Sequence, residues 1–252
     1  MKELWKSTAS RIMLIFTLGI ILNIAVSIMG FGAINGRLSS ICGLLMIVGF
    51  IWYCVNLSKF AKLQTNEENR SSVNKVVGGN ILLVAGSILI AIVEGPFIIS
   101  LILDSVSTEV GLTFLSIMPI LILSIPSIPP YLAYRMMEKG YHELSQSQTF
   151  NPKCQNGFKK LKQSATLKKH IVLTYFVLRC ICIYLLMNIS SGIELLQAMD
   201  KVTVILAIAG LAIFILGIDA LVKWFTGWEI VKNNGPEETE EGTTHQPINI
   251  KI

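Results

Sequence analysis

The side chains best suited to chemistry in this sequence are ionisable groups inside long apolar stretches. Val76–Leu103 contains one of them, Glu94, which is followed directly by Gly95 and Pro96. A proline inside a helix removes a hydrogen bond, and interrupted helices that carry an acid form the ion sites of many transporters. The pattern is also typical of a kinked helix end whose carboxylate reaches outer-leaflet water. Of the two interpretations, we favour the kinked helix end.

Arg179 and Asp219 are the other charged residues within apolar stretches. A charge at mid-bilayer costs about 2.5–3.5 kcal/mol on insertion scales, so it normally has a partner. Counted from the cytoplasmic edge, Arg179 lies ~14 Å deep and Asp219 ~6 Å deep at helical rise. The arginine side chain covers this difference, so we predict an ion pair with a structural role rather than a substrate or proton site. Asn23 belongs to a helically spaced stripe of small and polar residues, which predicts close packing between helices.

Other kinds of active site find little support. Glu138 and His142 are four residues apart, a spacing found among metal ligands, but no third ligand is nearby. The five cysteines include no CxxC pair, and no serine, threonine or cysteine lies in a recognisable catalytic motif. We therefore expect no catalytic residue, metal or cofactor, and we expect that the protein is not an enzyme.

The composition predicts an all-α integral membrane protein. Hydrophobic residues make up 52% of the 252 residues and charged residues 15%, against roughly 25% charged in soluble domains. The apolar stretches predict six transmembrane helices within a membrane domain of residues 1–232, at about 12–32, 40–55, 76–103, 112–134, 170–187 and 202–222. The last segment, 233–252, is acidic and contains Gly235 and Pro236, a composition typical of disorder.

The distribution of positive charge predicts the orientation. Of the 21 Lys and Arg residues, 18 lie in the two terminal segments and the two connections on the same side as the termini. Arg37 and Lys201 lie on the other side, and Arg179 lies within a span. Cytoplasmic loops are enriched in Lys and Arg, so both termini are expected in the cytoplasm of a cell-membrane protein. The net charge of +5 then reflects topology, and we expect no nucleic-acid partner.

A weak internal repeat favours an arrangement of three hairpins. Aromatic or apolar residues follow the second, fourth and sixth spans with periods of 81 and 87 residues: Tyr53, Phe60 and Leu63; Tyr134, Tyr141 and Leu144; Leu221, Trp228 and Val231. We expect each hairpin to end in a short cytoplasmic amphipathic helix. The alternative is that exiting helices simply carry aromatic collars at the interface. Four prolines crowd the fourth span, so we expect the third and fourth helices to be kinked.

The basic segment 135–169 offers the clearest functional hypothesis. Phe158, Leu161 and Ala165 share one helix face amid lysines, a pattern typical of a helix lying on an anionic membrane surface. The sequence thus indicates a non-enzymatic multi-pass protein whose basic segment binds lipid head groups or a partner. That partner is left open between a second copy of the chain and a cytosolic protein. The alternative is a small-solute or ion transporter or channel that uses broken third and fourth helices.

Overall fold

The computed structural model describes residues 2–31, 36–105, 127–187 and 192–235, and within these ranges its secondary structure is helical without strands. The predicted all-α fold is therefore confirmed. Three segments are long and apolar enough to cross a membrane: Lys2–Leu22, Leu45–Lys62 and Thr203–Asn233. The helices are α1 (Lys2–Phe31), α2 (Gly36–Lys62), α3 (Glu67–Ser105), α5 (Ile128–Gln146), α6 (Pro152–Met187) and α7 (Gly192–Asn233).

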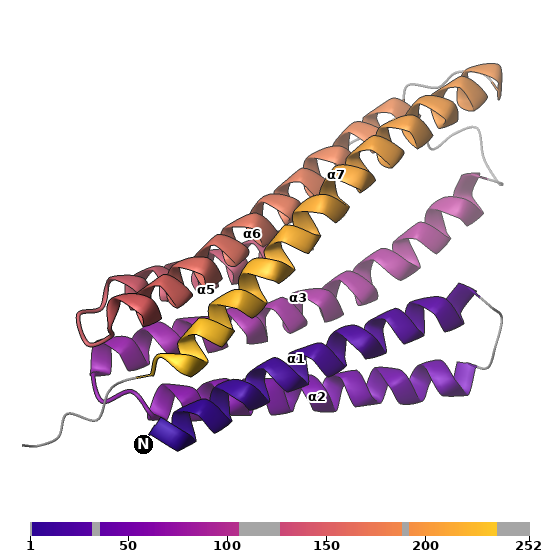
Figure 1. Ribbon diagram of the computed structural model, residues 1–252. Coiled ribbons are helices and arrows are strands. Elements are labelled where there is room, and N and C mark those ends of the chain that lie inside the picture. Colours follow the sequence, from indigo (N-terminus) through magenta and orange to yellow (C-terminus); the bar gives the residue numbers. More distant parts are fainter. Residues whose placement is uncertain (1, 32–35, 106–126, 188–191, 236–252) are drawn as a thin grey trace, which may run out of the picture.

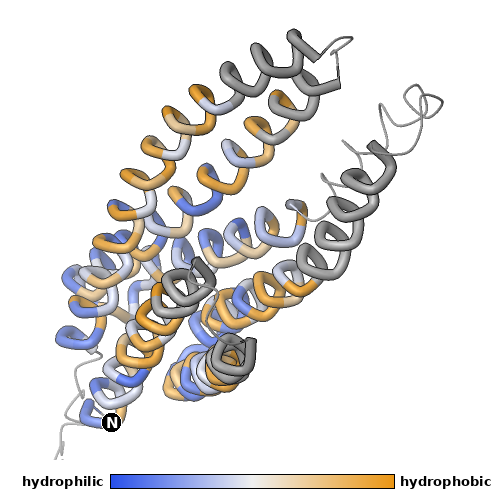
Figure 2. Tube along the Cα trace, turned by 90° about the vertical axis from the view of Figure 1, so that its right-hand side faces the viewer, coloured by the Kyte–Doolittle hydropathy of each residue, from blue (hydrophilic) through white to orange (hydrophobic). Residues whose placement is uncertain are grey.

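The helices form a closed ring in the order of the sequence. Each packs on its neighbours, with the most extensive packing within the pairs α6–α7, α3–α5 and α5–α6, and α7 returns to α1. The helices converge at the end that carries the N-terminus and diverge toward the other end (Figure 1). Hydrophilic segments gather mainly at the converging end (Figure 2). The chain thus forms a bundle that is closed at its polar end and splayed at its apolar end.

The buried core lies in the converging half of the bundle. Its largest fully buried side chains include Trp5, Phe60, Phe158 and Trp228, which come from four different helices. In the diverging half, apolar side chains are exposed, among them Leu18, Ile51, Ile208, Leu211 and Phe214. Apolar faces of this extent fit lipid rather than water as their surroundings.

The prediction that each hairpin ends in a separate short surface helix is wrong after the second and sixth predicted spans, whereas a short amphipathic helix, α5, does follow the fourth. The segments after the second and sixth predicted spans continue α2 and α7 without interruption, and the basic amphipathic stretch is the first half of α6. Phe158, Leu161 and Ala165 are buried in the common core rather than facing a membrane surface. Their apolar stripe packs on neighbouring helices because the converging bundle supplies a protein surface at that level.

The third predicted span is one continuous helix in the structure, and the kink expected in it stays a prediction. Helix α3 runs unbroken from Glu67 to Ser105, through Gly95 and Pro96. A proline removes one backbone hydrogen bond while the turns on both sides can continue the helix. Most of the predicted fourth span lies outside the described residues. Its last part is α5, which begins at Ile128 with prolines in its first turn, where a missing N–H is tolerated.

The positions of the predicted repeat meet in the core. Phe60, Tyr141 and Trp228, which are equivalent in the three hairpins, are all buried and surround one narrow gap between the helices. Two hairpins also share a close helix contact at equivalent glycines. A Cβ on Gly140 would lie 2.5 Å from the Ser72 carbonyl oxygen of α3, and one on Gly227 would lie 2.9 Å from the Gly157 carbonyl oxygen of α6.

The ring is closed by the two ends of the chain. The Trp5 Nε1–H of α1 donates a hydrogen bond of 2.8 Å to the carbonyl oxygen of Val231 in the last turn of α7. The last carbonyls of a helix have no partner within it, so Trp5 satisfies one of them. Gly235, within the segment predicted to be disordered, is buried against the same indole. Residues 236–252 lie outside the described part of the chain.

Candidate functional site

The predicted intramembrane polar residues are only partly described. Glu94 and Pro96 lie within α3, Asn23 within α1 and Arg179 within α6, but their side chains are outside the described structure. The side chain of Asp219 is described: its Oδ2 accepts a 2.5 Å hydrogen bond from Lys223 Nζ, one turn along α7. The sequence analysis did not identify this local partner. The ion pair between Arg179 and Asp219 stays a prediction.

A chamber of about 280 Å³ lies inside the ring, where the converging half gives way to the diverging half. All six described helices contribute to its wall, so it lies on the axis of the bundle. Its lining residues are Phe16, Tyr53, Asn80, Leu83, Tyr134, Met137, Tyr141, Leu161, Ser164, Ala165, Lys168, Leu221 and Trp224. The wall is mainly apolar and aromatic, with a few polar groups, as is usual for small-molecule sites.

Among the described residues that line the chamber, Lys168 is the one cation. Its ammonium group lies 5.3 Å from the centre of the Phe16 ring, within the range of a cation–π contact. Within the described ranges it makes neither a hydrogen bond nor an ion pair, whereas the adjacent Lys169 is bound to Glu138 at 2.5 Å. Burial lowers the pKa of Lys168 to about 8 because its charged form is poorly solvated there.

The hydroxyl groups of Tyr134 and Tyr141 are the other donors available in the chamber. No hydrogen bond joins either hydroxyl to another residue in the part of the chain that the structure describes. In contrast, Asn80 Nδ2 donates to Val76 O at 2.8 Å and Ser164 Oγ donates to Ala220 O at 2.6 Å. The described wall therefore offers one ammonium group and tyrosine hydroxyls to a ligand, and it includes no carboxylate.

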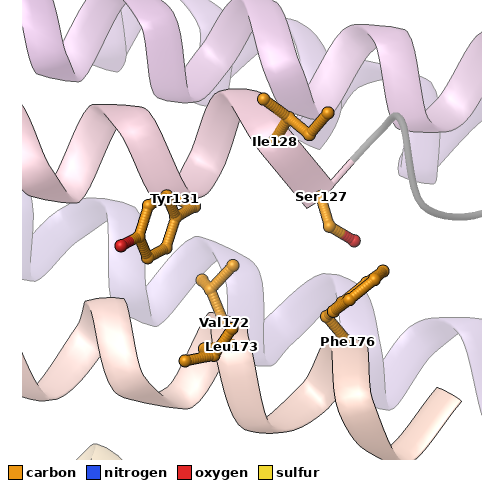
Figure 3. Close-up of a pocket in the computed structure, with 6 residues that line it drawn as sticks. All are labelled: Ser127, Ile128, Tyr131, Val172, Leu173 and Phe176. Carbon is orange, nitrogen blue, oxygen red and sulfur yellow. The ribbon is translucent and has the colours of Figure 1, made fainter. Parts of the chain in front are cut away.

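A second cavity opens between α5 and α6. It has a volume of about 250 Å³ and an almost wholly apolar lining. Figure 3 shows Tyr131 on α5 and Val172, Leu173 and Phe176 on α6 reaching toward it, with Ser127 and Ile128 at its edge. Such a groove fits a hydrocarbon group better than a polar one.

Two ion pairs join α5 to its neighbours on either side. Glu143 accepts hydrogen bonds from Lys75 at 2.6 Å and from Ser72 at 2.7 Å, both on α3. Glu138 accepts from Lys169 and Thr166, both on α6. His142 Nδ1 lies 3.2 Å from Lys162 Nζ. Glu138 and His142 thus contact lysines, and the described residues contain no cluster of three metal-ligating side chains.

The pair between Glu143 and Lys75 leads to a testable pH dependence. Burial alone would raise the pKa of Glu143, but hydrogen bonds from Lys75 and Ser72 outweigh it and hold the pKa below its usual value. The unfolded chain therefore binds more protons between the two pKa values, so this stabilisation is present above about pH 4.3 and is lost as the pH falls through the folded-state pKa. We expect Glu143→Gln to lower the free energy of unfolding by about 1 kcal/mol at pH 7.

Thermal unfolding of the detergent-solubilised protein between pH 7 and pH 3 would measure this difference. The wild-type and Glu143→Gln curves should converge at low pH, where the carboxylate is protonated. Glu229→Gln, at an exposed position of α7, is the matched control and should change stability little at any pH. A difference between wild type and Glu143→Gln that persists unchanged at pH 3 would contradict the assignment.

No protein-family model matches this chain, and no curated protein or solved structure matches it either. The site is therefore defined by its geometry alone. The sequence analysis grouped Lys168 with the other lysines of one basic helix. Its position in the helical stripe with Leu161 and Ala165, four and three residues apart, is the signal that could have distinguished it.

Proposed function

We propose that this chain crosses a cell membrane six times, as three hairpins, with both termini in the cytoplasm. Three segments with the length and composition of membrane spans and the exposed apolar faces of the diverging half support its membrane location. The Lys- and Arg-rich connections lie at the converging end together with the N-terminus, which supports the cytoplasmic assignment of that end. The converging half is then a cytoplasmic bundle directly beneath the bilayer.

The proposed activity is non-enzymatic: the cytoplasmic bundle binds anionic lipid head groups. The observation that carries this proposal is the position of exposed cations beside exposed apolar residues. Arg11 precedes the exposed Leu14 on α1, and Arg135 follows the exposed Leu132 on α5. Each cation at the border of an apolar surface contributes about 1 kcal/mol to the free energy of binding to anionic head groups near the membrane. A cytosolic protein or a second copy of the chain with an acidic surface would use the same cations.

The topology is tested with single thiols introduced at Ser107 and Ser147 in a chain without its native cysteines. In intact cells, an impermeant maleimide should label Ser107→Cys, while Ser147→Cys should be labelled only after permeabilisation. Ser147 lies directly after α5, at the converging end. Labelling of both thiols from outside would contradict the proposed orientation.

Lipid binding is tested by extracting the protein in polymer-bounded native membrane discs and measuring the phospholipids retained. We expect about twofold enrichment of anionic lipids, which should disappear when Arg11, Arg135 and Lys139 are replaced by glutamine. Replacing Arg37 and Lys201, on the opposite side in the proposed topology, is the matched control and should leave the enrichment unchanged. Equal lipid composition in all three proteins would overturn the proposal.

A small-solute or ion carrier is the second candidate, and the axial chamber with an unpaired Lys168 is the observation that favours it. Flux measurements on protein in liposomes, with a panel of ion gradients, separate the two functions. Flux that depends on Glu94 would favour the carrier, because a carboxylate within a span is the expected cation ligand there.

A further inference from the structure

The axial chamber and the α5–α6 groove adjoin each other along the same two helices. Tyr134 of the chamber lies three residues from Tyr131 of the groove on α5. Lys168 of the chamber lies four residues from Val172 of the groove on α6. Side chains three or four residues apart on a helix are neighbours, with about 5–6 Å between their Cβ atoms. The polar contents of the chamber therefore lie one helical turn from the apolar groove.

The chamber has the chemistry of an anion site. Among the described residues, its ionisable lining consists of Lys168 and the tyrosines Tyr53, Tyr134 and Tyr141, and none of these repels an anion at neutral pH. Lys168 is partly shielded from solvent and has no counter-ion among the described residues, which is unfavourable for an ammonium group, and an anion that binds there relieves that cost. Tyrosine hydroxyl groups add donors suited to phosphate oxygens. The volume of about 280 Å³ is close to the lower end of the range for small-molecule sites, about 300–1,000 Å³.

The groove has the complementary chemistry. Its apolar lining and open side admit a hydrocarbon chain, and Val172, Leu173 and Phe176 belong to the predicted fifth span. An anion site that adjoins a hydrocarbon site at the border of the bilayer matches the two halves of a lipid.

We propose that the chamber and the groove form one binding site for an anionic phospholipid, with its phosphate on Lys168 and one acyl chain between α5 and α6. This inference rests on the proposed membrane placement of α6. It goes further because it assigns a single bound lipid to named residues, whereas the exposed cations attract the bilayer surface as a whole.

The test is native mass spectrometry of the full chain in detergent, titrated with phosphatidylglycerol, whose phosphodiester keeps one negative charge over the working pH range. Lys168→Gln should weaken binding of the first lipid at least tenfold, while Lys168→Arg should stay within threefold of wild type. Lys62→Gln, an exposed cation at the far end of α2, is the matched control and should change the affinity less than twofold. Thermal unfolding identifies any variant that has lost its fold.

The groove is tested by Leu173→Trp, because Leu173 is partly exposed and a larger ring there would fill the cavity. This variant should reduce at least fivefold the preference for long-chain over short-chain phosphatidylglycerol. Val204→Trp, at an exposed position of α7, is the control and should keep the wild-type preference.

A pH titration of the wild-type protein tests the site without a variant. Binding should fall several-fold between pH 7 and pH 9.5, because the ammonium form of Lys168 is lost as the pH rises through about 8. Tyr53 from α2 and Tyr134 and Tyr141 from α5 are the other titratable groups that the structure describes on the wall, and burial raises the pKa of Tyr141 well above the range titrated. The chamber residues from α1, α3 and α7 do not titrate.

Equal affinity of wild type and a folded Lys168→Gln protein, or a flat pH profile, would overturn the inference. Binding of phosphatidylcholine as tight as that of phosphatidylglycerol would also overturn it. So would a glycerol phosphate affinity equal to that of the lipid, because the ligand would then be a soluble phosphate. The proposed function fails separately, through the thiol-labelling pattern and the lipids retained in native discs.

Discussion

Replacing Trp5 by alanine is expected to lower the free energy of unfolding by about 3–5 kcal/mol, the usual cost of removing a large buried aromatic side chain. Trp5 is 1% exposed, and its ring centre lies 4.4 Å from that of Phe60 and 6.0 Å from that of Phe150. The substitution also removes the hydrogen bond to Val231 that joins α1 to α7. The expected loss of stability thus has two causes: the cavity left by the ring, and the Val231 carbonyl oxygen, which loses its hydrogen-bond donor.

Circular dichroism in mild detergent, with increasing dodecyl sulfate, measures the change in stability. The buried thiol of Cys154 gives a second measurement, because burial raises its pKa to about 12 and keeps it unreactive until the core opens. Trp5→Phe keeps most of the ring and should cost about 1 kcal/mol for the lost hydrogen bond. Trp52→Ala is the matched control, because Trp52 is 52% exposed. A loss after Trp52→Ala as large as that after Trp5→Ala would contradict the assignment of the core.

The second large effect is expected at Gly227, where α6 and α7 approach each other closely. A Cβ there would lie 2.8 Å from Leu161 Cγ and 2.9 Å from the Gly157 carbonyl oxygen. Leucine can change rotamer, but a backbone carbonyl moves only if the helix moves. Gly227→Ala should therefore destabilise the bundle by about 1–3 kcal/mol, the usual cost of overpacking.

Gly217→Ala in the same helix is the matched control. No atom outside the local helix lies within 4 Å of a Cβ at that position. Because alanine favours helix over glycine, this variant should be as stable as wild type or more stable by up to about 1 kcal/mol. The same detergent unfolding measurement compares the two variants. If both variants change stability in the same direction and by the same amount, the close contact at Gly227 does not determine the cost of adding a side chain there.

The helical class and the apolar segments could be predicted from the sequence because both depend on local composition. The converging bundle could not. Phe60, Tyr141 and Trp228 follow predicted spans at similar offsets, a pattern that fits interfacial collars as well as a shared core. Only their packing around one gap distinguishes the two. The apolar stripe of α6 had the same ambiguity, because periodicity shows that a face is covered without showing whether lipid or protein covers it.

The candidate site was harder to predict for a related physical reason. The rule that charges within apolar segments have functions identifies residues such as Asp219 from sequence alone. Lys168 lies two residues before the predicted fifth span, among other lysines, so that rule does not apply to it. What distinguishes it is the absence of a partner within the described residues, whereas Lys169 binds Glu138. That contrast depends on the orientation of two adjacent side chains around one helix, which the three-dimensional arrangement determines.

The contact between Trp5 and Val231 has a consequence for how the protein is made. The two partners of this hydrogen bond are 226 residues apart in the sequence, and Trp5 is synthesised first. The seam between α1 and α7 therefore cannot form until α7 has left the ribosome, whereas α1 can pack on α2 earlier. During that interval the Trp5 ring can pack on Phe60 of α2, but its Nε1–H lacks the acceptor that Val231 supplies in the finished ring.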